Sequence, residues 1–432
     1  MDILFKNVTA VTMNRDEPIL NDVCIGVKNG KIEYIGLYDD KIIAKRTIDG
    51  SKKIMMPGLI NTHTHTPMTM LRGYANDLKL EEWLFEHIIP AELKMSDEMV
   101  KTGAEIAVAE MISSGTISYT DMYFNVDEIA AVAEKSGIKA NLSNAVITPE
   151  GKPYKLKDDN SYIETLRVLN DYDGSCGGRI KADASIHAVY TSCPEAWQAV
   201  AEFASSKKMR MHVHLSETRV EQENCLKKYG RTPAEMFDAH HVFDVPTLAA
   251  HTVWISDSDI EILAKRGVSA AHNPVSNLLL ASGIAPVSKM LAAGINVSLG
   301  TDGMASNNSH DLFEEIKLAS ILQKYATNDA SALPALEALI MATANGAKAQ
   351  GRENETGRIA AGLDADLILI DLDSPRQTAC YNPVYNLAYS TTGRDVCMTM
   401  CQGRILYENG DYKTVDIEKL LFEAREHVKN FI

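Results

Sequence analysis

The strongest constraint on the fold is an alternation of short apolar runs with amphipathic helical patterns across residues 57–355. The apolar runs are short and bounded by polar loops, as buried strands are. The eight predicted strands are Gly58–Asn61, Thr116–Asp121, Lys139–Ala145, Lys181–Ile186, Arg210–His214, Thr247–His251, Val268–His272 and Asn296–Gly300. Helical periodicity separates them, for example in Asp97–Ser114 and Ala330–Ala349. This order predicts a (β/α)8 barrel. A doubly wound open sheet is the alternative, but no GxGxxG motif follows an early strand.

Both ends of the chain have the pattern of β-hairpins. Asn29-Gly30 separates two apolar runs near the start, and Gln402-Gly403 separates two more near the end. Such residue pairs favour tight two-residue turns between antiparallel strands. We therefore predict two parts: a small β-sandwich with a C-terminal helix, formed by residues 1–56 and 356–432, and a barrel of residues 57–355 inserted between them. The length of 432 residues suits this division, since such a barrel takes about 250 residues.

The charge balance limits the partners of this chain. A formal net charge of −15 argues against nucleic acid, because binding a phosphate backbone requires a basic surface. A free nucleoside carries no phosphate and is not excluded. No apolar stretch is long enough to span a bilayer, and Met1–Lys6 has the pattern of a strand and not of a signal peptide. The seven scattered cysteines favour a reducing compartment. We predict a cytoplasmic protein with a small-molecule substrate and no membrane partner; a homo-oligomer is possible.

Polar residues gather where the predicted strands end. They are His63 and His65 after the first strand, His187 after the fourth, His214, His251 and His272 at the ends of the fifth, sixth and seventh, and Asp302 after the eighth. In a barrel of this kind the carboxyl ends of all strands share one mouth, where catalysis occurs. His63 and His65 are two residues apart, so in a strand they project from one face and can chelate one ion. Imidazoles with one carboxylate suit a cation such as Zn²⁺ that keeps a position open for water.

The remaining polar residues have plainer interpretations. His212 lies two residues before His214, and we expect it to pack deeper in the barrel or to support a ligand. Taken alone, Trp83 reads as helix packing and Glu92 as a solvated charge. A further group is predicted on solvated faces: His87, His240, His241, His310, His427, Glu81, Glu82, Glu314 and Glu315.

Several segments resemble a known family. Pro57–His65 resembles the opening of the amidohydrolase superfamily. Pro67–Gly73, His272–Asn277 and Gly300–Asn308 are similar to its methylthioadenosine/S-adenosylhomocysteine deaminases, and the likeness covers nearly the whole chain. The resemblance implies one Zn²⁺ per subunit, with Fe²⁺, Mn²⁺ or Ni²⁺ as alternatives. The residues it assigns are His63, His65, His214 and Asp302 as ligands, His187, Glu92 and Glu217 as substrate contacts, Trp83 as an apolar wall, and His251 as the residue that assists the attacking water.

The same resemblance implies hydrolytic loss of the 6-amino group from 5'-methylthioadenosine, S-adenosylhomocysteine, 5'-deoxyadenosine or adenosine. Glu217 would be the general acid–base group, and His251 and Asp302 would take the proton of the water. Two alternatives remain: another deaminase or chlorohydrolase of the superfamily, of guanine or triazine type, and a metal-free scaffold protein.

One departure from the family pattern concerns the 5' substituent. Relatives that handle S-adenosylhomocysteine often carry an arginine after the third strand, where this chain has Asn144. Asparagine cannot make the bidentate, charge-assisted contact that arginine makes with a carboxylate. Lys155 or Lys157 would be the substitute. We therefore expect S-adenosylhomocysteine to be less favoured than 5'-methylthioadenosine and 5'-deoxyadenosine.

Overall fold

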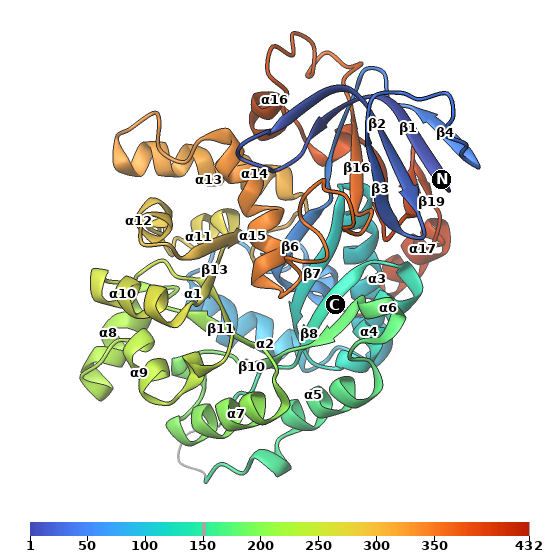
Figure 1. The fold of residues 1–432 in the computed structure, drawn as a ribbon. Helices are drawn as coiled ribbons and strands as arrows, with labels where there is room; N and C mark the ends of the chain where they lie inside the picture. Colours follow the sequence, from blue (N-terminus) through green and yellow to red (C-terminus); the bar gives the residue numbers. More distant parts are fainter. Residues whose placement is uncertain (149–152, 432) are drawn as a thin grey trace.

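The computed structural model describes residues 1–148 and 153–431, and their core is a parallel barrel (Figure 1). Its strands are β6 (Leu59–His65), β7 (Thr116–Met122), β8 (Lys139–Ser143), β9 (Ile180–Ala182), β10 (Ala184–Ile186), β11 (Met211–Leu215), β12 (Thr247–His251), β13 (Ser269–His272), β14 (Asn296–Leu299) and the short β15 (Asp302–Gly303). They form two five-stranded parallel sheets, ordered β15-β6-β7-β8-β9 and β10-β11-β12-β13-β14. The predicted (β/α)8 fold is confirmed.

Helices surround the barrel and connect its strands. They are η1 (Thr66–Leu71), α1 (Leu80–Glu82), η2 (Trp83–Ile88), α2 (Ile89–Glu92), α3 (Asp97–Ser113), α4 (Val126–Ser136), η3 (Leu156–Asp158), α5 (Asn160–Asp171), α6 (Ser175–Gly178), η4 (Val189–Thr191), α7 (Pro194–Lys207), α8 (Arg219–Tyr229), α9 (Pro233–Ala239), η5 (Val242–Asp244), α10 (Asp257–Arg266), α11 (Pro274–Leu279), α12 (Val287–Ala292), α13 (Leu312–Thr327), α14 (Ala335–Met341) and α15 (Ala344–Ala349). Local signals set their ends: the Ser96 hydroxyl caps α3 by accepting from the Met99 amide, and α4 stops at Gly137 with φ 89°. Among the described residues no helix has the length and apolar character needed to cross a membrane.

Two seams join the sheets into a closed barrel. At one seam β9 and β10 are parts of a single chain segment interrupted at Asp183, because β9 pairs with β8 whereas β10 pairs with β11. At the other seam the Thr62 hydroxyl donates to the carbonyl of Leu299 at 2.8 Å, which ties β6 to β14. The predicted continuous fourth strand is therefore two short ones.

The predicted helix Ala330–Ala349 is likewise divided, into α14 and α15. The break lets the Ile60 amide donate to the carbonyl of Ala342 at 2.8 Å. It also brings Gly346 so close to β6 that a Cβ there would lie 2.9 Å from the Cβ of Ile60. Tertiary contact with the first barrel strand thus overrides the helical periodicity of the sequence.

The two chain ends meet in one antiparallel and parallel sheet of nine strands (Figure 1). The strands are β1 (Ile3–Val11), β2 (Ile19–Lys28), β3 (Lys31–Gly36), β4 (Arg46–Asp49), β5 (Lys53–Pro57), β16 (Leu367–Asp371), β17 (Val396–Cys401), β18 (Arg404–Glu408) and β19 (Asp411–Tyr412). The sheet encloses its own core, which includes Phe5, Ile25 and Leu367. The turns at Gly30 and Gly403 touch, since a Cβ on Gly403 would lie 2.8 Å from the Cα of Gly30. The β-sandwich predicted from the two chain ends is thus one continuous sheet of nine strands, in which the turns at Gly30 and Gly403 come together.

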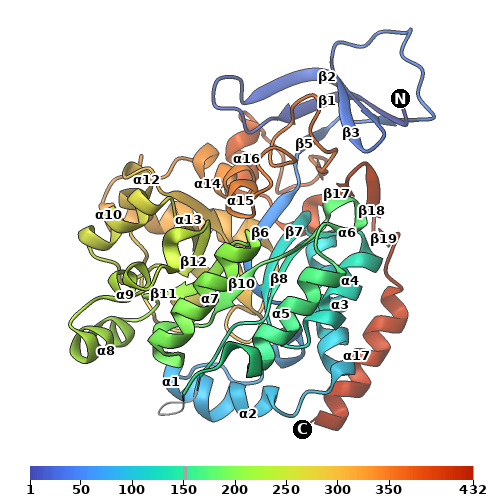
Figure 2. The same ribbon diagram turned by 60° about the horizontal axis from the view of Figure 1, so that its bottom comes forward.

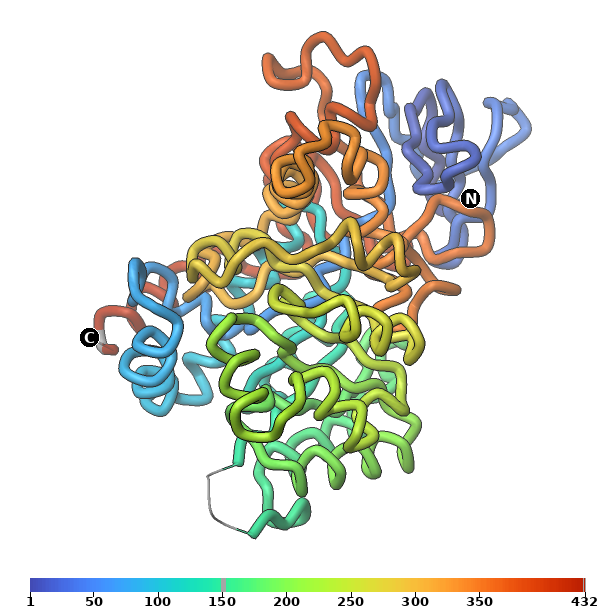
Figure 3. Tube along the Cα trace, turned by 90° about the vertical axis from the view of Figure 1, so that its left-hand side faces the viewer, coloured from blue at the N-terminus to red at the C-terminus, as the bar shows by residue number. Residues whose placement is uncertain are grey.

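After this sheet the chain returns to the barrel. The helix α16 (Pro383–Tyr389) and the short η6 (Gly393–Asp395) precede β17, and α17 (Ile417–Phe431) follows β19. Figure 2 shows α17 alongside α3, with α1 and α2 at the end of the barrel away from β1–β3. Figure 3 shows the blue strands of the N-terminal part on one side of the molecule, away from the green segments of residues 160–240. The terminal sheet therefore leaves the mouth formed by the carboxyl ends of the barrel strands uncovered.

A buried ion cluster links the barrel to the terminal sheet. Lys139, at the start of β8, is fully buried and donates to Asp364 at 2.8 Å and to Asp366. A Lys139→Met substitution removes the cation and leaves two carboxylates without it, so we expect a loss of about 3–5 kcal/mol of stability. Chemical denaturation measures this. Lys135→Met, at an exposed pair with Glu105, is the control and should cost at most about 1 kcal/mol. Equal effects of the two variants would contradict a linking role for the buried cluster.

Candidate active site

At the carboxyl ends of the barrel strands, five polar side chains lie close together: His63, His65, His214, His251 and Asp302. His63 and His65 lie inside β6, which runs further than the predicted Gly58–Asn61 and is buried throughout. Asp302 comes beside them because β15 pairs with β6, with Asp302 opposite Thr64. A side chain at Gly300 would block this approach, since a Cβ there would lie 2.8 Å from the Cβ of His63. The glycine at the end of the eighth strand is therefore required by packing.

The imidazoles and the carboxylate form one compact cluster. Asp302 Oδ1 lies 3.5 Å from His63 Nε2 and 3.3 Å from His65 Nε2. His214 Nε2 lies 3.3 Å from His65 Nε2, and His251 Nε2 lies 3.9 Å from Asp302 Oδ2. Two overlapping groups have ligand atoms within 4.8 Å of one another: His63, His65 and His214, and His63, His251 and Asp302.

Hydrogen bonds orient each imidazole so that its Nε2 faces the cluster. His65 Nδ1 donates to the carbonyl of Met122 at 2.6 Å, and His214 Nδ1 donates to the carbonyl of His187 at 2.8 Å. His63 Nδ1 lies 2.9 Å from His212 Nε2. Because Nδ1 carries the proton in this arrangement, Nε2 keeps its lone pair for a ligand.

Asp302 is held by two serines, one on α11 and one in the turn after β15. Ser276 donates its hydroxyl to Asp302 Oδ2 at 2.6 Å, and Ser306 does so at 3.2 Å. Asp302 and His251 both have left-handed backbones, with φ of 67° and 72°. Such conformations are uncommon outside glycine and occur where function demands a particular side-chain direction.

The electrostatics of the cluster are dominated by the carboxylate. Burial alone would raise the pKa of Asp302, but the imidazoles beside it outweigh this effect and hold that pKa well below its usual value. Burial opposes a charge on His65, yet the bond and charge of Asp302 prevail and raise the pKa of His65 to about 9. Burial lowers the pKa of His63 to about 4, and it also lowers that of His214.

The donor set fits a divalent cation. His63 Nε2 is buried, and among residues 1–148 and 153–431 it has no hydrogen-bond partner. Three imidazole nitrogens and a carboxylate oxygen, without thiolates, match the preferences of zinc in catalytic sites. A cation would also compensate the buried charge of Asp302, which an apolar interior otherwise penalises.

A cavity of about 320 Å³ opens from the cluster to the surface. That volume lies in the range of small-molecule sites. The predicted site residues that line it are His65, Trp83, Glu92, Asn144, His187, His214, Glu217, His251 and Asp302. Within the described part of the chain, Trp83 Nε1 and Glu92 Oε1 are buried and unpaired. The wall thus offers one donor and one acceptor to a polar ligand.

The two glutamates of the cavity differ in their surroundings. Burial raises the pKa of Glu92 to about 7, although a hydrogen bond with Tyr123 works against this. Burial also raises the pKa of Glu217, whose Oε2 lies 3.9 Å from His251 Nε2. Glu217 lies beside His251 of the imidazole cluster, whereas Glu92 lines the cavity from α2 and adjoins Tyr123.

His187 and Asn144 line the cavity from β10 and β8. His187 Nδ1 lies 3.0 Å from the hydroxyl of Thr191, and burial lowers the pKa of His187 to about 3, so it is a neutral ring. Asn144 Nδ2 donates to Glu164 of α5 at 3.0 Å. A carboxylate only accepts hydrogen bonds, so Glu164 fixes the orientation of this amide.

The two lysines proposed to replace an arginine lie elsewhere. Lys155 is exposed and lies 4.0 Å from Asp158, and neither Lys155 nor Lys157 is among the described residues that line the cavity. The charges and proline of residues 152–162 also predict a surface excursion after the third strand; its first residue, Lys152, lies outside the described residues.

Sequence reasoning missed the residues that support the site. Asn277 Oδ1 lies 2.9 Å from His251 Nδ1, and Glu221 accepts from the Glu217 amide at 2.8 Å. The Ser282 hydroxyl donates to Glu217 at 3.4 Å. Asn277 and Ser276 stand in the His272–Asn277 motif, which was the available signal. Nothing in the local pattern marked Glu221 or Ser282.

Two residues predicted on solvated faces are buried. His310 lies between Thr69 and Thr301, with its ring nitrogens 3.3 Å from each hydroxyl. Glu315 accepts from the Asn307 side chain at 2.6 Å and from the Val275 amide at 3.1 Å. Both predictions were wrong because α13 and the loop before it pack against the site loops and not against solvent.

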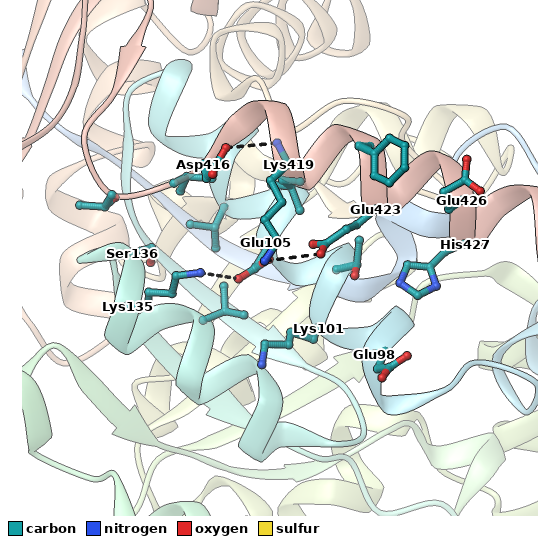
Figure 4. A pocket seen from close by; sticks show the side chains of 17 residues that line it. Glu98, Lys101, Glu105, Lys135, Ser136, Asp416, Lys419, Glu423, Glu426 and His427 are labelled. Atoms are coloured by element: carbon teal, nitrogen blue, oxygen red, sulfur yellow. Dashed lines mark hydrogen bonds and ion pairs between the residues drawn. The ribbon is translucent and has the colours of Figure 1, made fainter.

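A larger hollow of about 610 Å³ lies between α3, α4 and α17, away from the cluster (Figure 4). Its charged side chains pair with one another: Lys135 lies 3.1 Å from Glu105, and Lys419 lies 3.5 Å from Glu423. These pairs lie at the surface, and none of the residues that line the hollow belongs to the imidazole–carboxylate groups at the barrel mouth.

Known proteins share this architecture. The sequence model of the Amidohydrolase family matches residues 54–406. The chain is 43% identical to 5-methylthioadenosine/S-adenosylhomocysteine deaminase of Thermoanaerobacter pseudethanolicus, with 100% of each chain covered. It is also 43% identical to 5'-deoxyadenosine deaminase of Methanosarcina mazei, covering 100% of this chain and 98% of that protein. A crystal structure of an adenosine deaminase from Xanthomonas campestris with bound zinc superposes with a TM-score of 0.94 at 31% identity, covering 100% and 98%.

The cluster generates a prediction about metal content. We expect close to one divalent ion per purified chain and a loss of most of it in His65→Ala, because that variant removes a ligand atom central to the cluster. His427→Ala, on α17, is the control and should keep the ion. Elemental analysis after gel filtration measures both. An unchanged metal content in His65→Ala would exclude His65 as a ligand.

Proposed function

The chain belongs to the amidohydrolase family, and on that premise we propose that it is a hydrolytic deaminase of adenosine-type nucleosides. It releases ammonia from the 6-amino position and leaves the inosyl product. The observation that carries the proposal is the joining of the imidazole–carboxylate cluster to a cavity with two unpaired polar groups, Trp83 Nε1 and Glu92 Oε1, in the described residues. The two deaminases at 43% identity favour this substrate class over guanine or triazines. The complete set of candidate metal ligands disfavours the alternative of a metal-free scaffold protein.

His63, His65, His214 and Asp302 would hold one zinc ion. When bound, such an ion lowers the pKa of water to about 7 and makes hydroxide available at neutral pH. Asp302 Oδ2 and His251 Nε2, 3.9 Å apart, accept the proton of the attacking water and orient it. Asn277 keeps the His251 ring in place through its hydrogen bond to Nδ1.

Glu217 supplies the proton that the purine needs. Burial keeps its carboxyl protonated to higher pH than usual, since the pKa is raised. In this form it donates to N1 of the purine as the nucleophile adds to C6, and the ammonia leaves after a second proton transfer. The Glu221 carboxylate holds the backbone of Glu217 by accepting from its amide.

Recognition comes from the opposite wall of the cavity. Glu92 accepts hydrogen bonds from the ribose diol, and the adjacent Trp83 supplies an apolar face and an indole donor. His187 contacts the base. Asn144 stands near the 5' substituent, and its amide is already engaged by Glu164.

We further propose a cytoplasmic enzyme that acts on free nucleosides and not on nucleic acid. The net charge of −15 supports the exclusion of nucleic acid, because a negatively charged protein opposes binding of a phosphate backbone. Association into a homo-oligomer stays a prediction, tested by analytical ultracentrifugation.

Steady-state kinetics of two variants can distinguish the roles proposed for Glu217 and Glu92. Glu217→Gln keeps the shape but cannot donate the carboxyl proton, so kcat should fall by about 10²–10⁴ with the metal retained. Glu92→Gln should mainly raise KM for ribosides and leave kcat nearly unchanged. Steady-state rates of ammonia release, with metal content measured in parallel, test this. The reverse pattern would exchange the two roles.

The order of kcat/KM values among substrates tests the binding roles proposed for Glu92 and Asn144. Without a ribose diol, Glu92 stays unpaired, so free adenine should be a poorer substrate by about 10⁴-fold. We expect 5'-methylthioadenosine and 5'-deoxyadenosine at or above adenosine, with S-adenosylhomocysteine turned over less well, in kcat/KM measured on one preparation.

Asn144→Arg should raise kcat/KM for S-adenosylhomocysteine relative to 5'-methylthioadenosine by about tenfold, through a charge-assisted contact with its carboxylate. Asn160→Arg, an exposed position on α5, is the control for added charge alone. A tenfold preference of the unmodified enzyme for S-adenosylhomocysteine would overturn the role of Asn144.

A further inference from the structure

The ligand imidazoles differ in what orients them. His65 and His214 donate Nδ1–H to backbone carbonyls, of Met122 and His187, which are held by their strands. His63 is bonded instead to a side chain, that of His212, with 2.9 Å between Nδ1 and Nε2. The two rings are perpendicular, with centroids 5.0 Å apart. The orientation of His63 therefore depends on a side chain, which a substitution can remove, and not on a backbone carbonyl.

The protonation pattern of this pair follows from the chemistry of a ligand. His63 Nε2 faces Asp302 and must keep its lone pair to bind a cation, so the proton of His63 is on Nδ1. His212 Nε2 then accepts this bond, and the proton of His212 must be on its own Nδ1. That Nδ1 is buried, and in the described residues it has no partner. An unpaired buried donor costs stability, so folding alone does not favour histidine at this position.

We propose that His212 is a positioning residue for the metal site: it accepts the Nδ1 proton of His63 and thereby presents His63 Nε2 to the ion. It acts through His63 and does not touch the substrate. Its position on β11, two residues before His214, places both side chains on the same face of the strand. One strand thus provides a ligand and, one step deeper in the barrel, the support of another ligand. The inference rests on the metal site of the proposed function and not on the choice of substrate.

The chain contains a matched control. His272, on the neighbouring strand β13, is also a fully buried histidine, and neither of its ring nitrogens has a partner within the described part of the protein. It belongs to neither group of candidate ligands. Replacing it removes a buried imidazole of the same size that, among the described residues, makes no hydrogen bond to His63.

The test measures metal affinity and not turnover. In His212→Leu the holoprotein should lose Zn²⁺ to a chromogenic chelator with an apparent Kd raised about 10- to 100-fold, the range for loss of a group that supports a ligand. His272→Leu should change it less than about twofold. With Co²⁺ in place of zinc, the visible ligand-field spectrum should shift in His212→Leu and stay unchanged in His272→Leu.

A second pair of variants keeps the proposal testable if leucine prevents folding. Glutamine extends a carbonyl oxygen to about the place of His212 Nε2, whereas the shorter asparagine does not. His212→Gln should retain affinity close to the unmodified protein, and His212→Asn should lose it. Equal affinities of these two variants, or an equal loss in His272→Leu, would overturn the inference. Because the readout is zinc binding, a wrong substrate assignment cannot produce either result.

Discussion

The buried carboxylate of Asp302 is the charge on which the arrangement of the site depends. An anion with little access to water is costly unless cations or donors surround it. Imidazoles of β6 and two serine hydroxyls approach it, and β15 pairs with β6 to bring it there. The pairing of β15 with β6 also contributes to the seam at which the barrel closes. The same strand contact therefore closes the fold and places the carboxylate beside the imidazoles.

Around that charge the protein separates two tasks with residues of one type. Glu217 is buried and Glu92 is half-buried, and burial raises the pKa of both glutamates. Glu217 adjoins His251 and the reacting end of the cavity, whereas Glu92 adjoins Tyr123 and has an unpaired oxygen among the described residues. In the proposed function, environment and not residue type assigns proton transfer to Glu217 and recognition to Glu92. The role of Asn144 also depends on a neighbour, because Glu164 accepts a hydrogen bond from Asn144 Nδ2 and so fixes the orientation of the amide.

Much of this could be predicted from local pattern. His63 and His65 share a strand face because side chains alternate, and the ends of parallel strands meet at one mouth. The failures have long-range causes. His310 and Glu315 were predicted on solvated faces, yet they are buried against the segments that follow β6 and β13. The helix predicted over Ala330–Ala349 breaks because Gly346 packs against Ile60.

The sequence by itself determined the order of strands and helices, the histidines and aspartate at the strand ends, and hence the class of site. These follow from short periodicities, because neighbours along a chain share a face or alternate between faces. Only the tertiary structure decided which atom of each imidazole points inward. That choice depends on partners such as His212, which stands 149 positions from His63. A hydrogen bond requires an approach of about 3 Å in a defined direction. No local pattern specifies such an approach, and only the closed barrel produces it.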